Sequence, residues 1–368
     1  MMKFSCQQHE LNKALNIVGK IVANKNTLAI LDNVLLKLKG DKLELITTNL
    51  EIAINHQIEV KGKENGEITV PVRLILNYIA LLPAGNVSCT TNKDLSISLN
   101  SDGNKVDIKG LAAEEFPLIP EFTPVSEIKM PAGELKEGLE STIFATAYDQ
   151  IRPVLTGVLI KASKKEGVIV GTDSYRLAEK GFSFASVKDE TSCIIPNRTA
   201  AEMARILSSY QDEVALLIGE NQVRLVLSDV SITSRLIEGN YPPYEQIIPQ
   251  AAQTKITMNK EEFAQAVRRA SLFARDRANN INLEFKGKDK LLIKSTSSQI
   301  GSQETELPVK IAGPEGSIAF NALYLLDVIG HIDEEELVLE ITGSTKPGLI
   351  HGQEENDFRY IVMPLNLQ

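Results

Sequence analysis

The sequence carries a threefold internal repeat with a period of about 124 residues. The segments ITTNLEIA, VGTDSYRLA and IKSTSSQIG each follow a short apolar run, and Thr48, Thr172 and Thr296 stand at equivalent places in them. A second series, ITVPVRLILNYIALL, CIIPNRTAAEMARIL and IAFNALYLLDVIGHI, recurs every 125 residues. Because a repeated segment folds as a repeated structural unit, we expect three copies of one domain. The predicted domains are residues 1–125, 126–252 and 253–368.

Each copy divides into two similar halves, and each half has a short strand, an amphipathic helix and further alternating strands. In the first half, Leu11, Leu15, Val18 and Val22 recur at helical spacing. The stretch DKLELITTNLEIAINHQIEV that follows alternates apolar and polar residues as strands do. This pattern predicts an α+β fold with two helices packed on antiparallel sheets in every domain. The predicted helical segments are residues 8–25, 72–82, 133–152, 197–210, 259–277 and 320–332.

Charge is unevenly distributed along the chain. The net charge of −9 argues against a protein that coats itself with nucleic acid through an overall positive field. The six helical segments nevertheless sum to +3, which leaves −12 for the rest of the chain. If the helices of all copies face one way, one surface is mildly basic and the remainder is acidic. The alternative is that these basic residues only solvate helix faces.

Neither a membrane span nor a secretory leader is indicated. The chain lacks an apolar run long enough to cross a bilayer, and the opening MMKFSCQQHE has no apolar core of a signal peptide. The three cysteines, Cys6, Cys89 and Cys193, are odd in number and far apart, which is typical of buried thiols in a reducing compartment. We therefore expect a cytoplasmic protein without disulfides.

The run TDSYR, Thr172 to Arg176, gathers a hydroxyl, a carboxylate, a phenol and a guanidinium, which are groups typical of active sites. Its Ser174 lacks the flanking glycines of a nucleophile elbow, and no histidine base stands near it. The four histidines show no metal-ligand spacing, and no glycine pattern for a nucleotide appears. We predict no catalytic residue, metal or cofactor. Two interpretations stay open: a turn in which Asp173 and Ser174 cap backbone groups, or a nuclease or hydrolase using Asp173 and Arg176.

Several segments together resemble the bacterial sliding clamps, the β subunits of DNA polymerase III. They are TDSYRLA, SRLIEGNYPPYEQIIP, TLAILDNVLLK, the opening MKF and the terminal YIVMPL, and the resemblance covers essentially the whole chain. It implies a head-to-tail homodimer in which each chain, with three clamp domains, forms half of a closed ring. Helices would line the hole and sheets the outside. Such a ring encircles duplex DNA without reading its sequence and has no catalysis of its own.

The resemblance also implies partners and sites. The clamp would be opened by an ATP-driven clamp loader. It would tether the polymerase III catalytic subunit, other polymerases and repair factors through short apolar motifs. The implied partner-peptide pocket, with Thr172 and Arg176 as polar contacts at its rim, comprises Leu155, Thr172, Ser174, Tyr175, Arg176, Leu177, Pro242, Ile247, Pro347, Ile361, Val362, Met363, Pro364 and Leu365. The implied DNA-facing residues are Lys25, Arg73, Gln150, Arg152, Asn197 and Arg198.

The chain departs from the family pattern at three places, in or near the implied pocket. Pro153 and Val154 replace an aromatic pair seen in some relatives. Ser174 and Tyr175 stand where glycine and histidine are common, and Gln246 stands where an arginine does. A clamp-shaped scaffold that does not enclose DNA is the remaining alternative. Reversing the charge of Lys25, Arg73 and Arg198 without loss of DNA synthesis would indicate that scaffold.

Overall fold

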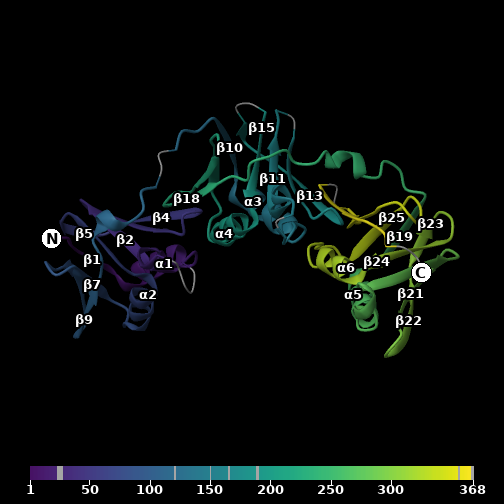
Figure 1. Ribbon diagram of the computed structural model, residues 1–368, viewed down its shortest axis with the longest axis horizontal. Coiled ribbons are helices and arrows are strands. Elements are labelled where there is room, and N and C mark those ends of the chain that lie inside the picture. The colour runs from purple at the N-terminus through teal and green to yellow at the C-terminus, as the bar shows by residue number, and fades with distance from the viewer. Residues whose placement is uncertain are drawn as a thin grey trace. The chain divides into compact units, whose positions relative to one another are not determined.

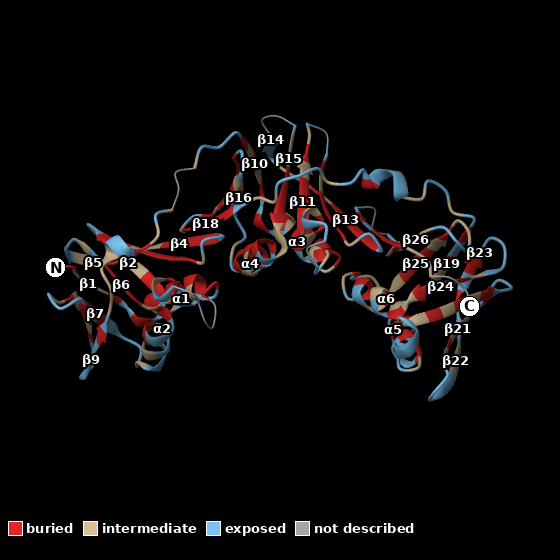
Figure 2. Cartoon of the chain, viewed as in Figure 1, coloured by how far each residue is buried: buried red, intermediate tan, exposed pale blue. Residues whose placement is uncertain are grey.

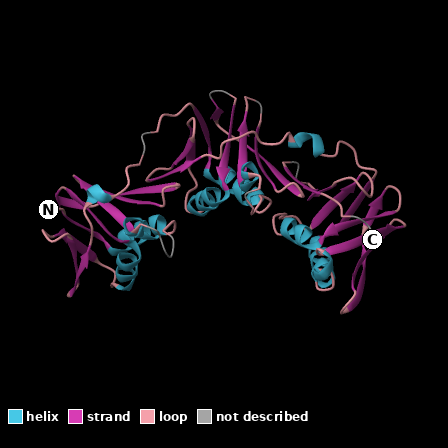
Figure 3. Ribbon diagram, in the orientation of Figure 1, coloured by secondary structure: helices cyan, strands magenta, loops and turns pink. Residues whose placement is uncertain are grey.

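The structure is a computed structural model that describes residues 1–22, 28–119, 122–149, 151–164, 166–187, 190–354 and 357–365. Two compact units make up the chain. Unit 1 comprises Met1–Gly133, Phe184–Asp189 and Arg205–Leu236, and unit 2 comprises Glu134–Ser183, Glu190–Ala204 and Ile237–Gln368. The middle repeat therefore contributes strands to both units. Within each unit the helices lie on one side of the strands (Figure 3).

Unit 1 contains two antiparallel sheets in its described residues. The first has the strand order β5 (Lys61–Glu64), β1 (Lys3–Gln7), β7 (Asn86–Thr91), β8 (Ser96–Ser101) and β9 (Asn104–Lys109). The second has nine strands, in the order β14 (Ser186–Val187), β10 (Ser126–Pro131), β16 (Glu213–Ile218), β17 (Gln222–Val226), β18 (Val230–Arg235), β4 (Ile52–Glu59), β3 (Lys42–Thr48), β2 (Asn33–Lys39) and β6 (Gly66–Pro71). Since β4 pairs with β18, one sheet runs without a break from the first repeat into the second.

Helices α1 (Gln8–Gly19) and α2 (Val72–Leu81) pack against each other and against the sheets of unit 1 (Figure 1). The predicted stripe of α1 is buried as expected, with Leu11, Leu15 and Val18 almost fully shielded from solvent. Figure 2 shows the buried faces of these helices turned toward the strands. The helix ends at Gly19, with Lys20 as its C-cap, rather than continuing through the predicted segment.

Among the residues of unit 2 that the structure describes, the strands likewise form two antiparallel sheets. The larger has the order β15 (Thr191–Pro196), β11 (Gly157–Ala162), β12 (Gly167–Thr172), β13 (Arg176–Phe182), β27 (Phe358–Val362), β26 (Gly348–Gly352), β25 (Glu336–Ile341), β19 (Thr254–Asn259) and β23 (Lys310–Ala312). The smaller has the order β22 (Gly301–Pro308), β21 (Lys290–Ser297), β20 (Asn280–Lys286) and β24 (Gly316–Asn321). The pairing of β13 with β27 joins the second repeat to the third, as β4 and β18 join the first to the second.

The remaining helices are α3 (Ala132–Ile143), α4 (Asn197–Leu207), α5 (Lys260–Ser271) and α6 (Ala322–Ile329). Helix α5 packs on α6 and on β19 to β22 around the fully buried Phe263, Phe320 and Tyr360. Helix α3 approaches β12 closely, since a Cβ added at Gly171 would lie 2.1 Å from the carbonyl oxygen of Thr142. Only glycine permits that approach.

The helices proper are not basic, which corrects the charge balance expected from the sequence. As bounded here, the six helices carry eight basic and eight acidic residues. The predicted excess came from residues beyond the helix ends, among them Lys20, Arg275 and Arg277. The basic charge therefore sits where helices meet their connecting loops.

Cys6, Cys89 and Cys193 are unpaired and buried, as predicted. Burial raises the pKa of the Cys6 and Cys193 thiols to about 12, so both stay protonated and unreactive at neutral pH. No helix in the described part of the chain is both long and apolar enough to cross a membrane.

A buried histidine lies where β4 meets the β17–β18 turn. His56 is 1% exposed, and its Nε2 lies 3.1 Å from Oδ2 of Asp229. The other oxygen of Asp229 accepts a hydrogen bond of 2.6 Å from the hydroxyl of Tyr210. Burial lowers the pKa of His56 below its ordinary 6.5, although Asp229 opposes this shift. The folded protein therefore holds His56 neutral at pH values where the unfolded chain has begun to protonate it.

Acid should consequently weaken unit 1. Above pH 6.5 neither state binds the proton, and as pH falls below that value the unfolded chain takes it first. The free energy of unfolding is expected to fall by up to about 1.4 kcal/mol per pH unit in that window. Denaturant titrations between pH 7.5 and 5.5 measure this slope. His56→Gln should reduce it, and the slope that remains should come from His331, whose pKa burial also lowers. If the pH dependence of the free energy of unfolding in His56→Gln equals that of the unchanged protein, another group is responsible for it.

Candidate functional site

The run from Thr172 to Arg176 forms a turn that caps itself. The Thr172 hydroxyl donates to the carbonyl oxygen of Arg176 at 2.6 Å. Oδ1 of Asp173 accepts from the backbone N–H of Tyr175 at 2.8 Å and from that of Arg176 at 2.9 Å. Ser174 adopts a left-handed φ of 79°, and its own N–H donates to the Thr172 hydroxyl. The turn interpretation is therefore right for Asp173, whereas Ser174 caps nothing and Thr172 takes that role.

Arg176 lies below the surface, not at a pocket rim as expected. Its side chain is 4% exposed, and all three of its nitrogens are engaged. Nε donates to Asp173 at 3.1 Å, Nη2 donates to the carbonyl oxygen of Phe144 at 2.7 Å, and Nη1 pairs with Asp327. The guanidinium also lies 4.5 Å from the ring centre of Tyr324.

Those partners give the guanidinium a fixed charge and a structural role. Burial alone would lower the pKa of Arg176, but Tyr360, Asp327 and Asp173 raise it above its ordinary value. The side chain thus ties the turn before β13 to α6 and to the end of α3. The Asp173 and Arg176 side chains and the Asp327 carboxylate are all engaged with one another, so the geometry argues against the nuclease or hydrolase alternative.

Beside this turn, apolar side chains of β13 and β27 form a continuous floor. Leu177 lies opposite Ile361 across the pair, and Leu349 follows on β26. Both Leu177 and Ile361 are fully buried beneath the segment that leads out of β18, which packs Tyr244 into the same cluster. Leu155 is buried at the start of β11, in the short 3₁₀ helix Pro153–Thr156.

The exposed residues of the predicted pocket lie around this floor. Tyr175 is 63% exposed, Ile247 is 40% exposed and Pro242 is exposed as well. Met363 is half-buried, and its N–H donates to the carbonyl oxygen of Tyr175 at 2.9 Å, which holds the end of β27 against the turn. The structure therefore groups most of the predicted pocket residues around one surface of unit 2.

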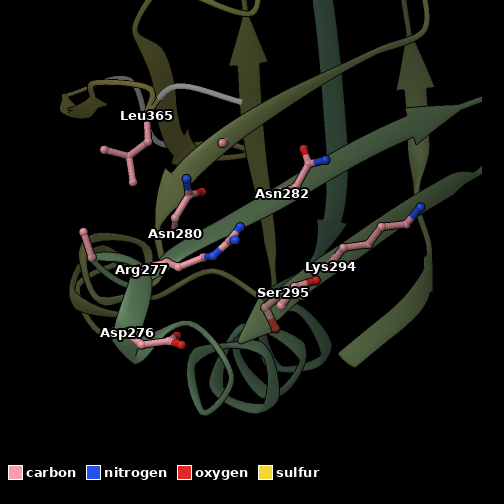
Figure 4. Close-up of a pocket in the computed structure, with 10 residues that line it drawn as sticks. Asp276, Arg277, Asn280, Asn282, Lys294, Ser295 and Leu365 are labelled. Carbon is pink, nitrogen blue, oxygen red and sulfur yellow. The ribbon is translucent and has the colours of Figure 1, made fainter. Parts of the chain in front are cut away.

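Leu365 is the exception. Its N–H donates to the carbonyl oxygen of Ala319 at 2.8 Å, so it extends the sheet edge at β24. There it lines a polar cavity of about 630 Å³ with Arg277, Asn282 and Lys294 (Figure 4). No other residue of the predicted pocket is among the described residues that line this cavity.

The predicted DNA-facing residues fall into different classes. Arg73 and Arg198 are exposed in the first turns of α2 and α4, and Arg73 donates to the carbonyl oxygen of Val22 at 3.2 Å. Arg152 is exposed and donates to the Ser174 hydroxyl at 3.3 Å. The Asn197 amide donates to the carbonyl oxygen of Ile143 and to Thr146, so it serves the fold. Lys25 and Gln150 lie outside the described residues.

Sequence reasoning missed the residues that hold Arg176. Phe144, Tyr324 and Asp327 stand 32 to 151 residues from it, and none belongs to a local motif. In the described part of the chain, no group of three or more His, Cys, Asp or Glu side chains is arranged to hold a metal ion.

Comparison with known proteins decides the family. Three models of the DNA polymerase III beta subunit match in succession: the N-terminal domain over residues 2–120, the central domain over 129–243 and the C-terminal domain over 245–366. The chain belongs to the DNA polymerase III beta subunit family. The resemblance inferred from the sequence is thereby confirmed, together with the three clamp domains.

Individual members of the beta subunit family agree over the full length. The beta sliding clamp of Staphylococcus aureus is 29% identical, with 99% of each chain covered. The solved DNA polymerase sliding clamp of Pseudomonas aeruginosa has a TM-score of 0.95 at 27% identity, and that of Bacillus subtilis has 0.94 at 28%; both matches cover 100% of each chain.

Proposed function

We propose that this beta subunit is a DNA sliding clamp that closes as a head-to-tail homodimer round duplex DNA and tethers the replicative polymerase for processive synthesis. It acts in the cytoplasm as a non-catalytic subunit. The observation that carries the proposal is a pair of strand edges, β9 and β22, which are left without the neighbour that their counterparts have.

The repeat shows what those edges lack. Each repeat contributes two groups of hydrogen-bonded strands. The last strand of one group is β9 in the first repeat, β18 in the second and β27 in the third. The last strand of the other group is β4, β13 and β22, respectively. Within the chain, β18 pairs with β4 and β27 pairs with β13. In the described structure β9 and β22 each pair on one side only. Because unpaired edges invite strand addition, β9 of one copy is suited to β22 of another, and a heterologous contact of this kind closes into a ring when the rotation allows.

The charges of the two edges complement each other. Lys105 and Lys109 lie exposed on β9 with Asp107 between them, and Glu304 and Glu306 lie exposed on β22. Within the chain, Lys109 also pairs with Asp94, Glu304 with Lys294 and Glu306 with Lys290, so a partner's charges would add to these exposed pairs. Opposite charges across paired strands stabilise the pair, and like charges oppose it. A head-to-tail contact brings lysines to glutamates, whereas a head-to-head contact would bring lysines together.

Reversing one edge should therefore weaken the dimer, and reversing both should restore it. Glu304→Lys with Glu306→Lys is expected to raise the dimer Kd at least about tenfold, since like charges then face each other. Adding Lys105→Glu and Lys109→Glu in the same chain should recover most of that loss. Analytical ultracentrifugation measures both values. Glu213→Lys with Glu220→Lys, on exposed positions of unit 1 away from β9, is the matched control.

Failure of the second pair of changes to rescue the first would contradict pairing between β9 and β22. Loss of dimer in the control would show that net charge alone governs association.

We place the DNA contacts on the basic residues at helix starts and helix ends. Arg73, Arg152 and Arg198 are proposed to attract phosphates, and Asn197 to brace the start of α4. Lys25 and Gln150, which lie outside the described residues, are proposed as further DNA contacts. A clamp that slides needs phosphate attraction without base readout, so scattered arginines suit it better than a dense basic stripe.

We further propose that partners dock on the surface around Tyr175 and Met363. Support comes from the exposed ring and proline side chains over a buried apolar floor, the arrangement that anchors short apolar motifs. Leu155, Thr172, Arg176, Leu177, Ile361 and Val362 then shape the site from below, and Ser174, Tyr175, Pro242, Ile247, Pro347, Met363 and Pro364 meet the peptide. The polymerase III catalytic subunit, the clamp loader and repair factors are the proposed partners.

A further inference from the structure

A second groove lies in unit 1, where β4 meets β18, and the proposed function makes no use of it. It has a volume of about 210 Å³. We call it the first-junction groove and define it by the lining residues that the argument uses: Thr48, Leu50, Pro117, Leu118, Gln222 and Arg235.

The turn that walls this groove is built like the turn at Thr172. The Thr48 hydroxyl donates to the carbonyl oxygen of Ile52 at 3.0 Å, and Oδ1 of Asn49 accepts from the N–H groups of Glu51 and Ile52. Leu50 has a φ of 74°, against 79° for Ser174. A branched side chain is costly in that conformation, so the surroundings must hold the turn in place.

The opposite wall corresponds as well. The N–H of Arg235 donates to the carbonyl oxygen of Glu51 at 3.2 Å, as that of Met363 does to Tyr175. Pro117 stands one repeat before Pro242. The first-junction groove is thus the counterpart, one repeat earlier, of the surface proposed to receive partner peptides.

The chemistry of the two surfaces differs. Leu50 and Leu118 are 51% and 95% exposed, so the rim of the groove presents two large apolar side chains to solvent. Its floor is more polar, because Thr233 and Ser234 take the places of Ile361 and Val362, beside the apolar Ile52 and Ala53.

An amide and a guanidinium lie beside that rim. Gln222 and Arg235 are neighbours across β17 and β18 and both line the groove, and no side-chain partner is described for either. Glu51 is the one carboxylate among the described lining residues. An apolar rim next to an amide and a guanidinium matches an aliphatic side chain next to a carboxylate.

The size of the groove limits the occupant. Small-molecule sites enclose roughly 300–1,000 Å³, so 210 Å³ suits one or two side chains of an extended chain rather than a whole cofactor. We propose that the first-junction groove binds a short extended segment of a partner protein in which an aliphatic residue adjoins an aspartate or glutamate. The inference rests on the proposed function in one respect, namely that the surface at Tyr175 and Met363 receives peptides.

The test uses the fluorescein-labelled peptide Ser-Leu-Asp-Leu-Ser and the full-length protein, with binding followed by anisotropy. In a Met363→Asp background, which disables the other surface, the peptide should still bind. Arg235→Glu or Leu118→Asp in that background should each weaken it at least tenfold, and Lys42→Glu, exposed on β3, should not. Circular dichroism of each variant confirms folding.

The possible outcomes separate the two proposals. Binding that Arg235→Glu and Leu118→Asp leave unchanged, or no binding at all in the Met363→Asp background, would overturn the groove proposal. Binding that Met363→Asp leaves fully intact but that Arg235→Glu removes would support the groove and count against the peptide surface at Tyr175.

Discussion

Arg176→Met is expected to loosen β13 and α6 severely. The change leaves Asp173 and Asp327 without their cation and removes the donor to the carbonyl oxygen of Phe144. Removing one partner of a buried ion pair costs about 3–5 kcal/mol, and we expect the lower end because Asp327 is 44% exposed. Hydrogen exchange of the β13 and α6 amides should therefore accelerate about 100-fold.

Lys161→Met is the matched control. Lys161 lies on β11 of the same sheet and pairs with Glu245 at 3.5 Å, but both side chains are about half exposed. Its loss should cost less than about 1 kcal/mol. Exchange rates in Arg176→Met that equal those of the control would refute the structural role of the guanidinium.

Deleting Met363 to Gln368 should abolish binding of partner peptides and leave the dimer intact. The deletion removes the Met363 side chain and the bond from its N–H to Tyr175, as well as the bond from Leu365 to Ala319. We expect the affinity for an apolar motif peptide from the cognate polymerase to fall at least about 100-fold, as for loss of a central anchor. Fluorescence anisotropy measures the peptide, and ultracentrifugation the dimer.

A shorter deletion, of residues 366–368 alone, separates the anchor from the end of the chain. It should retain most of the affinity because Met363 and its bond to Tyr175 remain. An equal loss of peptide affinity in both deletions would indicate that the peptide binds nearer the C-terminus than Met363. Loss of the dimer would show that the deleted residues support more than the peptide surface.

The repeats and the class of fold could be predicted from the sequence because both depend on local patterns that recur along the chain. The apolar stripe of α1 was correct, and β3 and β4 are strands as predicted. Their alternation holds only in part, because residues 45–48 and 52–54 are all buried. The domain boundaries at residues 125 and 252 stay a prediction. The pairing of β4 with β18 and of β13 with β27 could not be predicted, since alternation tells which face a residue takes but not which distant strand lies beside it.

The site was predicted less accurately for a related reason. Arg176 was assigned to a pocket rim from its neighbours in the run TDSYR, whereas its burial depends on Phe144, Tyr324 and Asp327 in other elements. Leu365 follows Met363 closely in the sequence, but the bond to Ala319 carries it to another cavity. The prediction of a net positive charge on the helices was wrong because an amphipathic pattern does not fix where a helix ends.

The central claim is that the protein holds DNA by encirclement, and its most direct test is to break the circle. The clamp is loaded by its cognate loader and ATP onto a nicked circular plasmid, the plasmid is cut once, and retention is followed by gel filtration. Release of the clamp on linearisation is the predicted result, because a ring slides off a free end. Retention on the linear DNA would contradict the account and would mean direct adhesion to the duplex.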